Sequence, residues 1–123
     1  MHAQRPLSPR LSIYRWASGM LASIAHRVTG LILVLSVPFY LVFLHQLTGS
    51  PEEFSRLTAI LHSWMGQAGL WLVSVAVFYH LCNGIRFLCL DAGWGESREA
   101  MRRNSRLVLG ATVVAGLLFG VWL

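Results

Sequence analysis

The chain has 123 residues, of which 55% are hydrophobic and only 12% are charged, and all ten basic residues are arginine. This composition indicates a membrane protein and leaves too few polar residues for a sizeable soluble domain as well. The net charge of +5 comes from arginines that flank apolar segments, so it does not indicate nucleic-acid binding.

Residues 1–16 are polar and contain two prolines, which predicts an extended N-terminal arm. Three apolar segments follow, each near the roughly 20 residues that cross a bilayer. Backbone groups in lipid must bond within their own segment, so we expect helices. The sequence therefore predicts an all-α membrane protein, with residues 17–123 as a three-helix transmembrane domain and spans at about 21–47, 65–90 and 105–123.

The arginines predict the topology. Only Arg56 lies between the first and second spans, whereas nine arginines lie at the other ends of the spans. The positive-inside rule then places the N-terminus in the cytoplasm and the C-terminus in the periplasm. Because residues 1–12 resemble neither a signal peptide nor a transit sequence, we expect a bacterial inner-membrane protein. The nine are Arg5, Arg10, Arg15, Arg27, Arg86, Arg98, Arg102, Arg103 and Arg106.

Two local patterns predict helix boundaries and contacts. Ser50 and Glu53 have the spacing of an N-cap and its N3 partner, after a turn at residues 48–51. Thr112, Gly116 and Gly120 share one face of the third span and would let another helix approach closely. We expect that face to have no mate within the chain and to receive a helix of another subunit.

His80 is an ionisable side chain inside an apolar segment. A histidine within the membrane is unfavourable unless it is paired, so it marks a ligand site or a relay. Imidazole is also a common axial ligand of haem iron. The alternative is a histidine that is hydrogen-bonded to a neighbouring helix. His80, Gly84, Phe87 and Asp91 fall on one helical stripe.

The other histidines are expected at different depths. His26 and His45 are separated by nineteen residues, about 28 Å of helix, which places each near one membrane surface. His62 lies in the predicted outer loop and His2 in the arm. We therefore expect no second histidine at the depth of His80. A bis-histidine haem would need its other ligand from a different subunit.

Ser23, His26 and Arg27 form a polar group at the start of the first span. The planar guanidinium of Arg27 suits a carboxylate such as a haem propionate. The alternative is that Arg27 extends to the lipid headgroups. Arg86 lies off the His80 stripe and is equally well interpreted as an interface anchor.

Two segments resemble the signatures of a known family. They are RPLSPRLSIYRWASGMLASIAHRVTG over residues 5–30 and HLCNGIRFLCLDAG over residues 80–93. Both are similar to motifs of the cytochrome b556 membrane-anchor subunit of succinate dehydrogenase, respiratory complex II, and occur in the expected order. The resemblance covers essentially the whole chain.

The resemblance implies a role for each matching residue. His80 would be the axial ligand of haem b, and His26 and Arg27 would lie near a haem propionate. Ser23, Arg27 and Asp91 would line the ubiquinone site. A second membrane-anchor subunit would supply the other haem ligand, and iron–sulfur and flavoprotein subunits would dock on the cytoplasmic face.

Two positions depart from the family pattern. Phe87 stands where the family usually has a second histidine, and Arg10 replaces a histidine of the arm. Neither departure affects His80. We expect a subunit that is not catalytic alone; the alternatives are a fumarate reductase anchor and a structural anchor that lacks haem and quinone.

Overall fold

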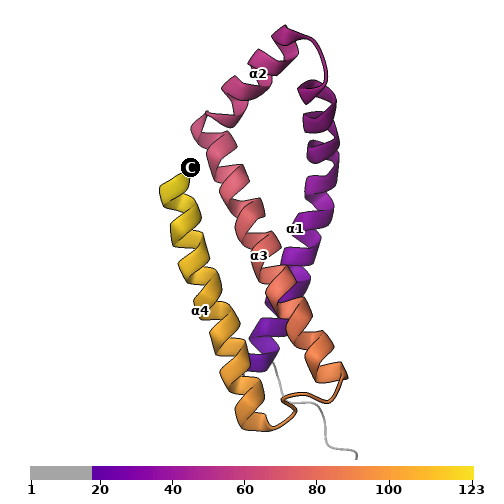
Figure 1. Cartoon of the computed structure of the whole chain (residues 1–123), viewed down its shortest axis with the longest axis vertical. Coiled ribbons are helices and arrows are strands. Elements are labelled where there is room, and N and C mark those ends of the chain that lie inside the picture. Colours follow the sequence, from indigo (N-terminus) through magenta and orange to yellow (C-terminus); the bar gives the residue numbers. More distant parts are fainter. Residues whose placement is uncertain (1–17) are drawn as a thin grey trace, which may run out of the picture.

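The computed structural model describes residues 18–123, so the predicted arm and its three arginines lie outside the described residues. The described part contains four helices, which confirms the all-α prediction (Figure 1). Three of them, α1, α3 and α4, are long and apolar enough to cross a membrane. The helices are α1 (Ser18–Leu47), α2 (Pro51–Leu61), α3 (Trp64–Asp91) and α4 (Arg98–Trp122). The arginines outside are Arg5, Arg10 and Arg15.

The short helix α2 is a fourth element that was not predicted from the sequence, because its 11 residues are too few and too polar to cross a bilayer. Its start was predicted correctly. The backbone N–H of Glu53 donates to the Ser50 hydroxyl at 3.3 Å, and the Ser50 N–H donates to the Glu53 carboxylate at 2.8 Å. This reciprocal capping box fixes the turn between α1 and α2.

Helix α4 begins seven residues before the predicted span. The Ala100 N–H donates to the Ser97 hydroxyl at 3.2 Å, and Glu99 lies in the first turn near the positive end of the helix dipole. The apolar pattern marks only the part of a helix that lipid can surround. The polar first turns of α4 therefore lay outside the predicted boundary.

Helix α3 lies between α1 and α4 and packs on both (Figure 1). The Trp71 indole N–H donates to the carbonyl of Gly116 at 2.7 Å. A Cβ at Gly120 would lie 3.5 Å from the same indole nitrogen. The small-residue face of α4 therefore receives α3 of the same chain, and the prediction that it has no mate within the chain is wrong.

Helices α1 and α3 touch near one end of the bundle and diverge toward α2, which bridges them (Figure 1). The space between the diverging halves is a cavity of about 820 Å³ with mainly apolar walls. At the same end, the Gln67 amide donates to the carbonyl of Leu123 at 3.1 Å and ties α3 to the end of α4. The polar contacts between α1 and α3 are all at the other end.

Candidate functional site

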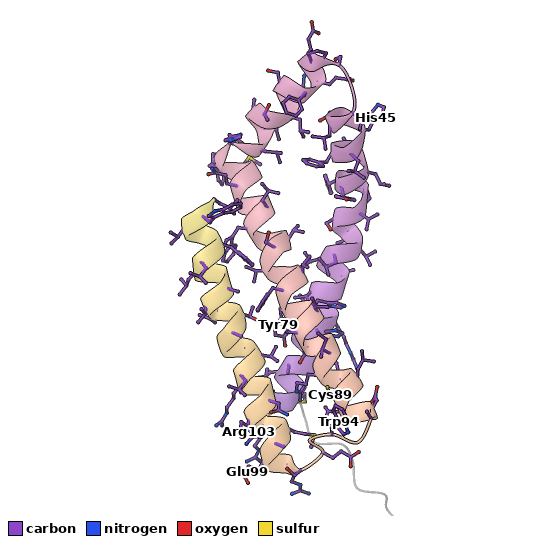
Figure 2. The ribbon with its side chains drawn as sticks, in the orientation of Figure 1. His45, Tyr79, Cys89, Trp94, Glu99 and Arg103 are labelled. Carbon is purple, nitrogen blue, oxygen red and sulfur yellow. The ribbon has the colours of Figure 1, made fainter. Side chains whose placement is uncertain are left out.

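A backbone carbonyl of α1 receives two side chains of α3. The Tyr79 hydroxyl donates to the Ala22 carbonyl at 2.9 Å, and the Asn83 amide donates to the same oxygen at 3.2 Å. Asn83 is fully buried, and Figure 2 shows Tyr79 in the lower half of α3, where α1 and α3 cross. Buried polar groups need such partners, so these bonds fix how α1 and α3 cross.

Arg86 continues this polar contact on the next turn of α3. Only 8% of its surface is exposed, and its guanidinium donates to the Asn83 amide oxygen at 3.2 Å. The guanidinium carbon lies 5.3 Å from the centre of the Phe87 ring. Within residues 18–123, its Nε–H is buried without a hydrogen-bond partner. Arg86 therefore lies inside the bundle, and the alternative that it is an interface anchor is wrong for this chain.

The imidazoles of His26 and His80 stack face to face. Their centroids are 3.9 Å apart and the rings are 9° from parallel. By helical rise, His26 lies about 12 Å from the start of α1 and His80 about 16 Å from the end of α3. Because the two helices are antiparallel, these positions meet. The expectation that no histidine shares the depth of His80 is wrong, since it placed each helix in the membrane separately.

The contacts of His80 define its tautomer. Its Nδ1 lies 3.1 Å from the backbone carbonyl oxygen of His26 and 3.3 Å from the Thr29 hydroxyl. A carbonyl oxygen can only accept a hydrogen bond, so Nδ1 carries the proton. Nε2 then keeps its lone pair, as required of a neutral metal ligand. A Cβ at Gly30 would lie 3.1 Å from Cε1 of His80, so this glycine leaves the space that the ring occupies.

Three residues of the predicted stripe surround His26. They are His80, Phe87, whose ring lies edge-on at 5.3 Å and 78°, and Gly84, where a Cβ would lie 3.5 Å from Nε2 of His26. Within residues 18–123, Nε2 of His26 is buried without a hydrogen-bond partner. An unpaired buried nitrogen is unfavourable, so this atom is suited to an acceptor or donor supplied from outside the chain.

Ser23 and Arg27 lie one turn apart on α1, with Ser23 partly buried and Arg27 exposed. Asp91 is also exposed, at the end of α3. Gly19 of α1 lies at the level of Arg86 of α3. Asp91 comes five residues after Arg86, which is about 7.5 Å further along α3. Asp91 therefore lies beyond the level of Ser23 and Arg27, and the chain brings only the two α1 residues close together.

Three residues of this site, Tyr79, Asn83 and Thr29, were not predicted from the sequence, and Arg86 was predicted without its role in the contact between helices. Tyr79, Asn83 and Arg86 form a stripe at i, i+4 and i+7 beside the His80 stripe. Polar residues at that spacing in an apolar helix predict a contact with another helix. Thr29 carried no such signal, because a threonine in a membrane helix commonly bonds its own backbone.

The comparisons with known proteins identify the family of the chain. A family model described as succinate dehydrogenase/fumarate reductase transmembrane subunit matches residues 1–119. The chain belongs to this family. It is therefore a multi-pass membrane subunit, and the resemblance seen in the two sequence motifs is confirmed.

Several relatives carry the name succinate dehydrogenase cytochrome b556 subunit. The protein of Coxiella burnetii is 33% identical over 124 residues, covering 100% of this chain and 99% of that protein. The protein of Paracoccus denitrificans is 34% identical over 114 residues, covering 93% and 88%. The human mitochondrial cytochrome b560 subunit of succinate dehydrogenase is 33% identical over 119 residues, covering 94% and 69%.

Proposed function

We propose that this chain is the haem b- and quinone-binding membrane anchor of a succinate:quinone oxidoreductase, and that it passes electrons from an iron–sulfur subunit to ubiquinone. His80 would be an axial ligand of the haem iron. The haem would accept and release one electron at a time. The observation that carries this proposal is the 3.1 Å contact between Nδ1 of His80 and the His26 carbonyl oxygen, because a proton on Nδ1 would leave Nε2 available to iron.

The haem would be shared with a second membrane-anchor subunit. The rings of His26 and His80 are stacked face to face at 3.9 Å, so their nitrogens do not point at each other across a space that one metal ion would fill. His45 lies at the far end of α1 (Figure 2), and His62 lies at the end of α2. Among the histidines of residues 18–123, these positions favour a partner subunit as the source of the second ligand. His26 and Arg27 would face a propionate, for which the unpaired Nε2 of His26 is a suitable group.

The haem assignment is tested by His80→Ala in the assembled complex. We expect the low-spin b-type spectrum to be lost or strongly weakened. The matched control is His45→Ala, since His45 is exposed at the opposite end of α1. An unchanged low-spin spectrum in His80→Ala would refute the assignment, and a wild-type complex without haem would favour a purely structural anchor.

Ser23, Arg27 and Asp91 would line the quinone site. Ser23 and Arg27 are one turn apart on the same face of α1, and the exposed guanidinium of Arg27 would reach a quinone oxygen. Asp91 would contribute from the end of α3, across a space that the iron–sulfur subunit or quinone would fill. This arrangement makes the site incomplete in the isolated chain.

The quinone assignment predicts that two assays diverge. Ser23→Ala and Arg27→Leu should lower succinate:quinone activity far more than succinate oxidation with a soluble dye, which takes electrons before the membrane. Ser36→Ala is the matched control, because within residues 18–123 its hydroxyl bonds only the Leu33 carbonyl of α1, at 2.7 Å. Equal loss in both assays would indicate failed assembly and would favour the alternative that Arg27 contacts the lipid headgroups.

The complex would lie in a bacterial inner membrane, with the N-terminus and the α3–α4 loop in the cytoplasm. This orientation follows from the arginines, because four of them gather at the start of α4 and only Arg56 lies in α2. Flavoprotein and iron–sulfur subunits would dock on that face. The four are Arg98, Arg102, Arg103 and Arg106.

A further inference from the structure

The hydroxyl of Thr29 lies between the backbone of α1 and the imidazole of His80. Its oxygen is 2.9 Å from the carbonyl oxygen of Ala25 and 2.9 Å from that of His26. Threonine in a helix commonly donates its hydroxyl proton to such carbonyls one turn earlier. The proton of Thr29 is therefore directed to its own helix, and a lone pair faces Nδ1 of His80 at 3.3 Å.

We infer that Thr29 is a positioning residue for haem ligation. Its hydroxyl and the His26 carbonyl together accept the Nδ1–H of His80, which fixes both the tautomer and the rotation of the ring. The inference rests on the proposed role of His80 as an axial ligand. Because Thr29 belongs to α1 and His80 to α3, the packing of the two helices sets the orientation of the ligand.

The hydroxyl also influences the iron. An acceptor at Nδ1–H increases the electron donation of the imidazole, and such outer partners tune a metal through its ligand. Greater donation favours ferric over ferrous haem. Removing the hydroxyl should therefore raise the midpoint potential. The His26 carbonyl remains at 3.1 Å, so we expect only about a threefold change in the ferric-to-ferrous ratio, which is about 30 mV at 59 mV per tenfold.

The decisive comparison is Thr29→Ser against Thr29→Ala in the assembled complex, because these two variants differ by one oxygen atom. The haem potential is measured by redox titration of its visible absorbance, and the ferric haem by electron paramagnetic resonance. We expect the serine variant to match the wild type, and the alanine variant to shift upward in potential with altered low-spin resonances. Thr112→Ala is the control, since that hydroxyl also bonds a carbonyl of its own helix, at 2.8 Å, but lies on α4.

Several results would overturn the inference. Equal potentials and resonances in the serine and alanine variants would show that the hydroxyl does not act on His80. Loss of haem from both variants would assign Thr29 to helix packing. Loss from the alanine variant alone would support the inference, since the oxygen is then what retains the ligand. Low-spin haem that survives His80→Ala would refute the proposed function itself, and no result of the Thr29 series has that signature.

Discussion

Replacing Asn83 by leucine is expected to lower the free energy of unfolding by about 2–3.5 kcal/mol, because one hydrogen bond from α3 to α1 and one within α3 are lost at nearly constant volume. The bond from the Asn83 amide to the Ala22 carbonyl contributes about 0.6 kcal/mol, the average for side chains between membrane helices. The bond from Arg86 is charge-assisted and contributes about 1.5–3 kcal/mol. Tyr79→Phe removes one neutral bond to the same carbonyl and should cost only about 0.6 kcal/mol.

A second substitution tests the origin of that loss. In Asn83→Leu the guanidinium of Arg86 stays buried, with its Nε–H already unpaired. Adding Arg86→Met removes the unsatisfied charge, so the double variant should recover about 1.5–3 kcal/mol relative to Asn83→Leu. The two substitutions are therefore expected to be strongly non-additive.

The assay is denaturation of the purified complex by sodium dodecyl sulfate in mixed micelles, followed by circular dichroism. Midpoints are compared among the wild type, both single variants, the double variant and Tyr79→Phe. Additive effects of Asn83→Leu and Arg86→Met would refute the reasoning, because Arg86 would then not depend on Asn83. A loss in Asn83→Leu no larger than in Tyr79→Phe would do the same.

Three further outcomes are expected. Gly30→Ala should lower haem retention by roughly tenfold, measured as the haem that remains after the complex is washed, because its Cβ would press on His80. Gly69→Ala is the control and should leave retention unchanged, because a Cβ there meets no described atom within 4 Å. Trp71→Phe removes the indole bond to α4 and should lower the free energy of unfolding by about 0.5–1.5 kcal/mol. The hydrogen bond from the Ser50 N–H lowers the pKa of Glu53, so this carboxylate stabilises α2 at pH values above its ordinary pKa and ceases to do so as the pH falls through the lowered value. The protection of the α2 amides, measured as exchange relative to the intrinsic rate at each pH, should therefore decrease at low pH in the wild type and lose that acid dependence in Glu53→Gln.

The helices could be predicted because each depends on residues close together in the sequence. Apolar segments long enough to cross a bilayer must be helical, and the Ser50–Glu53 cap depends on a spacing of three residues. Helix α2 and the first turns of α4 were missed because they are polar enough to resemble a loop in a search for spans. Local chemistry therefore predicted the elements better than their boundaries.

The site could be predicted only in part, because its geometry depends on how α1 is aligned against α3. The stripe of His80, Gly84 and Phe87 was readable as one helix face, and those residues do gather around one imidazole. The sequence does not reveal at which level two helices cross, so it could not predict that this imidazole belongs to His26. The small residues of α4 were misassigned for the same reason: their mate, Trp71, lies 45 residues earlier.

The alignment of α1 and α3 has a physical cause. Apolar side chains gain little by leaving lipid tails for a neighbouring helix, so polar contacts and close packing decide where membrane helices meet. The described α1–α3 hydrogen bonds gather at one end, on the carbonyls of Ala22 and His26, with Thr29 nearby. Toward α2 the helices diverge and leave an apolar cavity of about 820 Å³. The proposed role of His80 as a metal ligand would require a rigid surrounding, and His80 lies in the part of the bundle where the two helices are bonded together.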